Sequence, residues 1–211
     1  MQKKELTAIA VKRFEELYPD AICSLRYEDP FQLLIATRLS AQCTDARVNI
    51  VTPALFAAFG EAKSMAAAPL EQVEELIKTC GLYKTKAKDL IGIGRMLCEK
   101  YGGRVPDTLE ELTALPGVGR KTANLVCGDV YHKPAVVTDT HFIRIMNRLG
   151  LVSTTDPLKV ELAMKKLLDP QKSNDFCHRT VLFGRAVCTA RRAYCEVCVL
   201  NDICPKVLEK R

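Results

Sequence analysis

Residues 115–141 read LPGVGRKTANLVCGDVYHKPAVVTDTH, and this stretch predicts both helical structure and a chemical site. It opens with a Gly-x-Gly turn at Gly117 and Gly119 and passes directly into a helical pattern that carries Lys121 in its first turn. Asp139 follows where a second helix is expected to begin. The N–H groups of such a turn and the helix dipole favour an anion such as phosphate. An amine beside the turn, together with a carboxylate, favours covalent chemistry on a sugar.

Helical signals continue on both sides of this stretch. Asp29-Pro30 and Asp156-Pro157 each place a capping residue before a proline at the first helical position. Asp107 is expected to cap a short helix, and Pro53 is expected to kink or break another. Residues 134–137 are the only strand-like run. Because no period-2 pattern persists, the sequence predicts an all-α protein of short helices.

Composition and charge limit the classes of protein that this chain can represent. Its 211 residues suffice for one or two compact domains, and a net charge of +6 with a pI near 8.8 fits a nucleic-acid partner. Tryptophan is absent, which disfavours aromatic stacking on single strands. The first residues form a charged amphipathic pattern without a signal sequence, and no apolar run is long enough for a membrane span. We therefore expect a cytoplasmic location, nucleoid-associated in a prokaryote, with no membrane partner.

Four of the ten cysteines are grouped near the C-terminus, with the spacing C-x6-C-x2-C-x5-C. In a reducing compartment four thiolates this close need a neutralising metal centre. Structural zinc usually shows two C-x2-C pairs, whereas this sequence has one; iron–sulfur clusters tolerate more variable spacing. Zinc and four unrelated buried thiols remain alternatives. The candidate ligands are Cys188, Cys195, Cys198 and Cys204.

Five segments together resemble the endonuclease III family of DNA repair glycosylases, within the helix-hairpin-helix superfamily. LPGVGRKTA (115–123) matches the family hairpin, and TDTH (138–141) matches the segment that carries its aspartate. LSAQCTD (39–45) and GLYKTKA (81–87) match two further family segments. The cysteine spacing over 188–204 matches the family's [4Fe–4S] loop. The resemblance covers nearly the whole chain.

The resemblance implies two packed helical lobes with a DNA-binding cleft between them. A six-helix lobe with the helix-hairpin-helix motif would span residues 23–133, and residues 1–22 plus 134–211 would form an iron–sulfur cluster lobe. It implies a monomer that acts on duplex DNA containing damaged bases or abasic sites. The implied activity is that of a bifunctional DNA glycosylase and AP lyase of base excision repair, which removes oxidised pyrimidines and cleaves 3′ to the abasic site by β-elimination.

The resemblance also assigns roles to individual residues. Lys121 would attack C1′ of the nucleotide and form a Schiff base, and Asp139 would stabilise the positive transition state or relay a proton. A helix N-terminus disfavours a nearby cation, and partial burial of Lys121 would act in the same direction. The implied DNA contacts are Gln42, Leu82, Leu115, Gly117, Gly119, Arg120, His141, Arg191 and Arg192.

Each assignment has a simpler alternative. Lys121 as a phosphate ligand would make the protein a monofunctional glycosylase, and Asp139 as a plain helix cap would remove its chemical role. Leu82 could be a core leucine. A non-catalytic, DNA-binding iron–sulfur protein would use the same hairpin and the Arg191–Arg192 pair without cleaving a strand.

Three residues depart from the pattern of the family. Thr138 and Phe142 replace valines that commonly flank Asp-Thr-His, and Phe142 is expected to add bulk near the cleft. Cys43 replaces a small alanine beside Gln42. None of the three removes a catalytic group, so the expected consequence is confined to the preference for particular lesions.

Overall fold

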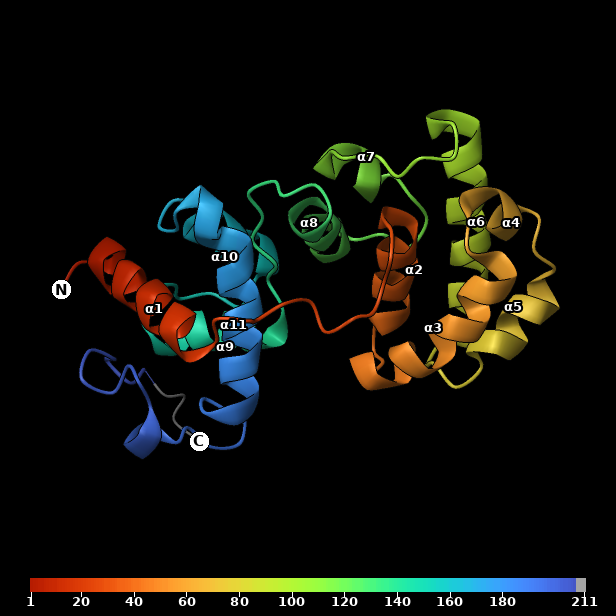
Figure 1. Ribbon diagram of the computed structural model, residues 1–211. Coiled ribbons are helices and arrows are strands. Elements are labelled where there is room, and N and C mark those ends of the chain that lie inside the picture. Colours follow the sequence, from red (N-terminus) through yellow and green to blue (C-terminus); the bar gives the residue numbers. More distant parts are fainter. Residues whose placement is uncertain (208–211) are drawn as a thin grey trace. The chain divides into compact units, whose positions relative to one another are not determined.

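The computed structural model describes residues 1–207, which form α-helices joined by short loops (Figure 1). Within this range there is no β-strand, and only an isolated bridge pairs Cys188 with Ala193. The all-α prediction is confirmed. The strand-like interpretation of residues 134–137 is wrong, because this buried segment is an extended connection without a pairing partner strand. No helix of the described residues is long and apolar enough to cross a membrane.

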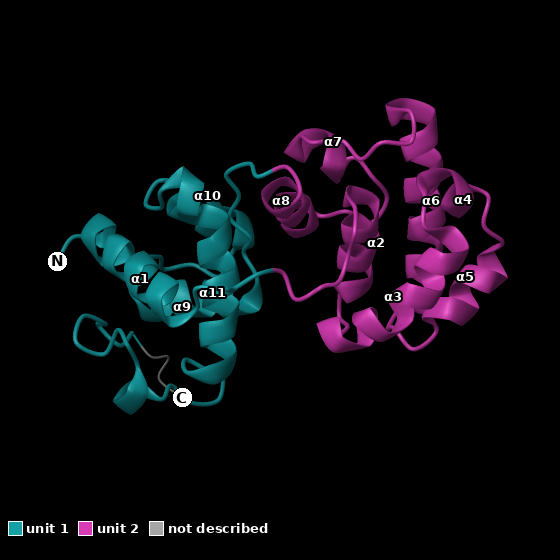
Figure 2. Cartoon of the chain, in the orientation of Figure 1, with its two compact units in different colours: residues 1–22, 132–211 teal, residues 23–131 magenta. Residues whose placement is uncertain are grey.

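The chain divides into two compact units, coloured separately in Figure 2. Unit 1 combines residues 1–22 with residues 132–211, and unit 2 is the continuous segment 23–131. Unit 1 contains α1 (Lys3–Leu17), α9 (Thr140–Arg148), α10 (Pro157–Lys165), η1 (Pro170–Lys172), α11 (Ser173–Ala186) and η2 (Cys195–Val197). Unit 2 contains α2 (Pro30–Ser40), α3 (Asp45–Phe59), α4 (Ala62–Ala66), α5 (Leu70–Ile77), α6 (Tyr83–Tyr101), α7 (Leu109–Thr113) and α8 (Arg120–Asp129).

Unit 2 is organised around the long helix α6. Gly94 lies on α6 where it meets α4, and a Cβ atom there would lie 2.7 Å from the backbone nitrogen of Ala66. The missing side chain therefore permits the close approach of the two helices. Helix α2 supplies an apolar face whose members are all completely buried, and this burial is the main favourable term for the unit. These residues are Leu33, Leu34, Ile35, Ala36 and Leu39.

Unit 1 has an aromatic core. Phe14 of α1 lies with its ring centroid 5.6 Å from that of Phe176 and 4.5 Å from that of Phe183, both on α11. Phe142 of α9 meets Phe176 edge to face at 6.1 Å. Phe142 is fully buried, so the bulk that it adds lies in this core and not on the surface of unit 1.

Two local predictions concern helices in unit 2. Pro53 is expected to kink or break a helix, whereas α3 continues through it without a break. A proline in a helix interior costs about 3 kcal/mol, and burial of Val51 and Leu55 on the same helix offsets that cost. Thr108, not Asp107, caps α7, because its hydroxyl accepts the backbone N–H of Glu111 and donates to the Glu111 carboxylate at 2.6 Å.

Candidate functional site

The glycine turn of the hairpin joins α7 to α8 and is shaped from within unit 2. Gly117 has φ +65°, a left-handed conformation that favours glycine. A Cβ atom at this position would collide with the side chains of Arg38 and Asp89. The backbone N–H of Val118 donates to the carbonyl of Leu115 at 3.1 Å, and the Leu115 side chain is buried. Leu115 therefore anchors the turn in the core, and Gly117 is required by the fold itself.

Arg38 and Asp89 form an ion pair beneath this turn that the sequence analysis missed. The Nε and Nη2 atoms of Arg38 donate to Oδ2 of Asp89 at 2.9 and 2.5 Å. Both side chains are mostly buried, where loss of one partner leaves an uncompensated charge. The pair joins α2 to α6 across 51 residues of sequence. No local motif signals such a contact.

Unlike Gly117, Gly119 is not required to be glycine by its backbone conformation or by its neighbours. Its φ is −90°, and a Cβ atom there would have no neighbour within 4 Å. Gly119 is also the N-cap of α8 and, lacking a side chain, leaves the first N–H groups of the helix without a side-chain cap. Open space above uncapped N–H groups is the arrangement that an approaching anion needs.

Arg120 and Lys121 occupy the first turn of α8, and both side chains are exposed. The expectation that Lys121 is partly buried is therefore wrong for the protein without DNA. An exposed side chain on a rigid helix is accessible to a macromolecular ligand, and its position is fixed at the backbone by α8. The two residues thus adjoin the open N-terminus described for Gly119.

Two further predicted contacts, Gln42 and Leu82, lie in adjacent loops of unit 2. Gln42 belongs to the loop 41–44 between α2 and α3, and Leu82 to the loop 78–82 between α5 and α6. Both have left-handed backbone conformations, with φ of 54° and 59°. Such conformations are costly for residues other than glycine and concentrate at functional positions. Leu82 is 57% exposed, so the alternative that it is a core leucine is wrong.

Asp139 caps α9 in unit 1. Its Oδ1 atom accepts the backbone N–H of Phe142 at 2.7 Å, which confirms the expected helix start. The carboxylate is half-buried, and among the described residues of unit 1 no hydrogen bond occupies its other oxygen. A capping role therefore leaves one oxygen for a second task.

His141 lies in the first turn of the same helix and pairs with Arg144, whose Nη2 lies 3.2 Å from its Nδ1. Burial lowers the pKa of His141, Arg144 acts in the same direction, and Asp139 opposes them. The imidazole is therefore kept neutral at physiological pH and available as a hydrogen-bonding group. Arg144 also donates to the carbonyls of Gly184 and Cys188, which fixes its guanidinium against α11.

All four grouped cysteines line a single cavity in unit 1, beside Ile145, Phe183 and Leu200. Burial, together with the thiols of the other three, raises the pKa of Cys198. Among residues 1–207, no three His, Cys, Asp or Glu side chains form a group that could hold a single metal ion. The four sulfur atoms nevertheless face one space, where their mutual repulsion would need a neutralising group. The converging ligands are Cys188, Cys195, Cys198 and Cys204.

Hydrogen-bond donors surround these sulfur atoms. The backbone N–H of Leu200 donates to Cys198 Sγ at 3.4 Å, and that of Lys206 to Cys204 Sγ at 3.3 Å. Arg148 donates to Cys188 Sγ at 3.3 Å. Sulfur atoms that receive N–H donors in an apolar setting are typical of the ligands of iron–sulfur clusters, whose potentials such bonds tune. The donor set therefore fits a cluster held by four cysteines.

The loop between the first two cysteines presents Arg191 and Arg192, both exposed. The Arg192 guanidinium pairs with Glu196 at 2.9 Å and lies 4.7 Å from the ring centroid of Tyr194. If Arg192 binds a DNA phosphate, it must give up its ion pair with Glu196. An exposed ion pair contributes little to stability, so losing it costs little free energy.

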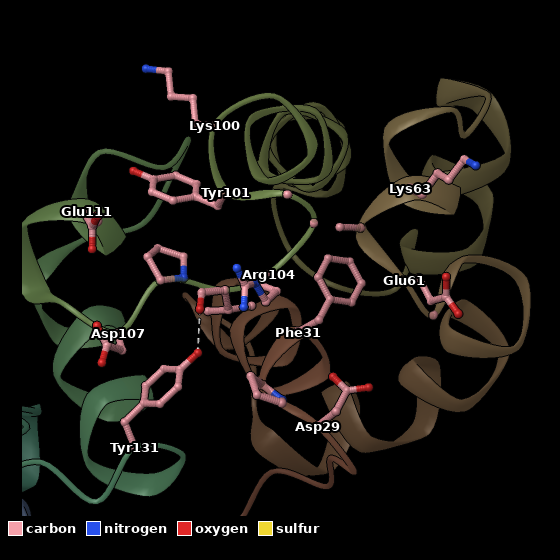
Figure 3. Close-up of a pocket in the computed structure, with 17 residues that line it drawn as sticks. Asp29, Phe31, Glu61, Lys63, Lys100, Tyr101, Arg104, Asp107, Glu111 and Tyr131 are labelled. Atoms are coloured by element: carbon pink, nitrogen blue, oxygen red, sulfur yellow. Dashed lines mark hydrogen bonds between the residues drawn. The ribbon is translucent and has the colours of Figure 1, made fainter.

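A separate cavity of unit 2 has a volume of about 1140 Å³ (Figure 3). None of the predicted site residues lines it. Figure 3 shows charged side chains of both signs around its rim and the Tyr131 hydroxyl donating to the Val105 carbonyl, at 2.6 Å. Mixed charge does not favour a polyanion, so this cavity is not part of the candidate site. Its rim includes Glu61, Lys63, Arg104 and Asp107.

Comparison with known proteins supplies the family. The model of the HhH-GPD superfamily of base excision DNA repair proteins matches residues 35–170. Endonuclease III of Synechocystis sp. is 45% identical over 96% of this chain and 93% of its own length. Endonuclease III of Escherichia coli (strain K12) is 38% identical over 91% of each chain. The chain belongs to the endonuclease III family.

Solved structures agree with this placement in the endonuclease III family. A trapped covalent intermediate of endonuclease III with DNA matches with a TM-score of 0.92 and 40% identity, over 98% of each chain. A non-covalent endonuclease III–DNA complex matches with the same TM-score and identity. As a member of the endonuclease III family, the protein is a DNA glycosylase and AP lyase of base excision repair, with DNA as its partner.

Proposed function

We propose that Lys121 is the nucleophile of a bifunctional reaction on oxidised pyrimidines in duplex DNA. The observation that carries this assignment is the position of Lys121, exposed in the first turn of α8 beside the open, uncapped helix N-terminus at Gly119. A phosphate held at that N-terminus brings the adjoining deoxyribose within reach of the amine. The trapped covalent complex of a relative at 40% identity supports a covalent route.

The proposed reaction releases the base first and then cleaves the strand. The unprotonated Nζ of Lys121 attacks C1′, the C1′–base bond breaks, and the base leaves with a proton. The C1′–O4′ bond then breaks, O4′ takes a proton from water, and the nitrogen lone pair forms the C1′=N bond of a Schiff base. Loss of a proton from C2′ then expels the 3′ phosphate, and water releases the lysine. We assign Asp139 to stabilise the positive charge that develops on the sugar, through the carboxylate oxygen not used for capping.

Gln42 and Leu82 are proposed to occupy the space that the extruded nucleotide vacates. Extrusion costs a few kcal/mol of unstacking, which inserted side chains recover in part. The exposure of both residues and their left-handed conformations support this role. Arg120, His141, Arg191 and Arg192 remain proposed contacts to the DNA. The Leu115 side chain is buried, so a contact from this residue is proposed for its backbone alone.

Duplexes that each carry one defined lesion test the proposed function. Release of the free base and scission of the strand are scored separately on the same samples. We expect both for oxidised pyrimidines. Base release without scission would instead indicate a monofunctional glycosylase, and DNA binding with neither product would indicate a non-catalytic protein.

The two glycines of the hairpin give a matched pair of variants. Gly117→Ala is expected to lower the free energy of unfolding by about 2 kcal/mol or more, because of its positive φ and the collision with Arg38 and Asp89. Gly119→Ala is expected to lower that free energy by only about 1 kcal/mol, since its methyl group meets open space and the loss is confined to alanine being a poorer N-cap than glycine.

The same pair separates folding from binding. Gly119→Ala should weaken binding to an abasic-site duplex about tenfold, because the methyl group occupies the space proposed for a phosphate. Urea denaturation and fluorescence anisotropy measure the two effects. If Gly119→Ala bound the duplex with the affinity of wild type, the proposal that a DNA phosphate binds at this turn would be wrong.

We further propose that Cys188, Cys195, Cys198 and Cys204 hold a [4Fe–4S] cluster. When bound, the cluster neutralises the four thiolates and crosslinks the loop that carries Arg191 and Arg192. The N–H donors to three of the sulfur atoms support a metal centre held by these cysteines, and the single C-x2-C pair favours the cluster over zinc. The role assigned to it is structural.

Metal content tests this assignment directly. Anaerobically purified protein should be brown and contain about four iron atoms per chain. Cys198→Ser should lose the colour and most of the iron, and the loop around residues 189–194 should become sensitive to protease. A colourless protein with one zinc ion per chain would contradict the cluster.

A further inference from the structure

The loops that carry Gln42 and Leu82 touch each other. A Cβ atom on Gly81 would lie 3.3 Å from the backbone carbonyl oxygen of Gln42, so the two backbones pass at close range. Each loop places a cysteine next to this contact. Cys43 directly follows Gln42, and Cys80 directly precedes Gly81. Both are free thiols; Cys80 is 1% exposed, and Cys43 is half-buried.

The two thiols also interact with each other. Burial raises the pKa of Cys80 to about 11, and the neighbouring Cys43 thiol acts in the same direction. Cys80 is therefore a protonated thiol at neutral pH, whereas solvent can reach Cys43. Two cysteines that flank such a close approach of two backbones are candidates for a disulfide, which requires their Cα atoms to come within about 7 Å of each other.

A buried cation lies beside the pair. Lys86 is completely buried, donates from Nζ to the carbonyl oxygen of Leu39 at 2.7 Å, and interacts electrostatically with both cysteines. Arg47 also acts on Cys80. The cysteine that meets solvent is Cys43, so oxidation would begin there.

We propose that Cys43 and Cys80 form a reversible disulfide when the protein meets a peroxide, and that this bond ties the Gln42 loop to the Leu82 loop. The thiolate of Cys43 attacks one oxygen of hydrogen peroxide and becomes a sulfenic acid, with hydroxide as the leaving group. The Cys80 sulfur then attacks the Cys43 sulfur, and the sulfenic oxygen leaves as water with the proton of Cys80. In total, two thiols and one peroxide give one disulfide and two waters.

The functional consequence rests on the roles proposed above for Gln42 and Leu82. Insertion of two side chains into a duplex requires each loop to adjust to the bases that it meets. A disulfide draws the two sulfur atoms to about 2.05 Å and couples the loops, which prevents independent adjustment. Misplacement by a fraction of an ångström is costly in catalysis, so we expect the oxidised protein to nick a damaged duplex about tenfold more slowly.

The bond itself is tested without reference to activity. Reduced holoprotein is treated with graded hydrogen peroxide, free thiols are blocked with an alkylating reagent, and a tryptic digest is analysed by mass spectrometry. We expect a linked pair of peptides containing Cys43 and Cys80, about 2 Da lighter than the two thiol peptides together, which disappears after dithiothreitol. Cys43→Ala should abolish it. Cys98→Ala, which alters a half-exposed cysteine elsewhere on α6, should retain it.

Nicking assays on the same samples test the consequence. Wild type and Cys98→Ala should slow on oxidation and recover with dithiothreitol, whereas Cys43→Ala should keep its rate through the same treatment. Oxidation of Cys43 to a sulfinic acid without the linked peptide would overturn the disulfide. If the linked peptide formed and the nicking rate did not change, the proposal that the disulfide restricts the two loops would be wrong. Reduced wild type that never nicks would refute the proposed function and leave the linked peptide as a separate result.

Discussion

Lys121→Ala is expected to abolish strand scission and the covalent adduct that borohydride traps between the protein and a damaged duplex. No other group can replace the attacking amine, so the rate of scission should fall on the order of 10³-fold or more. Single-turnover nicking and gel analysis of the trapped adduct measure both effects. Because Lys121 is exposed on α8, its removal should leave the free energy of unfolding nearly unchanged.

Lys121→Arg distinguishes a nucleophile from a phosphate ligand. Arginine keeps the positive charge and binds phosphate well, but its guanidinium does not act as the nucleophile. We therefore expect Lys121→Arg to bind DNA like wild type and to form no adduct. Lys100→Ala, which removes an exposed lysine of α6 outside the proposed site, is the matched control and should keep full activity. Scission by Lys121→Arg at the wild-type rate would contradict the assignment.

Asp139→Asn is expected to reduce turnover on the order of 10²-fold while leaving the fold intact. Asparagine is as good an N-cap as aspartate, so the bond to the Phe142 N–H should survive. The negative charge that stabilises the developing positive sugar is lost. Single-turnover base release compared with wild type measures the effect.

Asp139→Ala completes the comparison. It removes the cap as well as the charge and should lower the free energy of unfolding by about 1 kcal/mol in addition to the loss of turnover. Urea denaturation of the two variants separates the two roles of the carboxylate. If Asp139→Asn released bases at the wild-type rate, Asp139 would be a helix cap and nothing more.

The helical fold was predictable because its signals are local. Asp29-Pro30 and Asp156-Pro157 begin helices through caps and a fixed proline φ, which depend only on neighbouring residues. Pro53 shows the limit of such rules, since tertiary burial of Val51 and Leu55 keeps α3 intact around it.

The sequence predicted the motifs of the site but not the long-range contacts that hold them in place. The Gly-x-Gly turn can be read from the sequence, but the Arg38–Asp89 pair beneath it joins two helices far apart in the chain. Lys86 was part of a recognised motif, yet its complete burial against the carbonyl of Leu39 depends on the packing of α2 and α6. Contacts of this range follow from three-dimensional packing, which periodicity does not encode.

The composition of unit 1 from two distant segments affects how the chain matures during translation. Helix α1 is made first, yet its packing partners, Phe176 and Phe183 in α11 and Asp202 in the cysteine loop, are made last. At bacterial or slower rates of synthesis, α1 emerges roughly 10 to 40 seconds before them. The continuous unit 2 can fold on the ribosome in that interval, while Phe14 remains uncovered until α11 has left the exit tunnel.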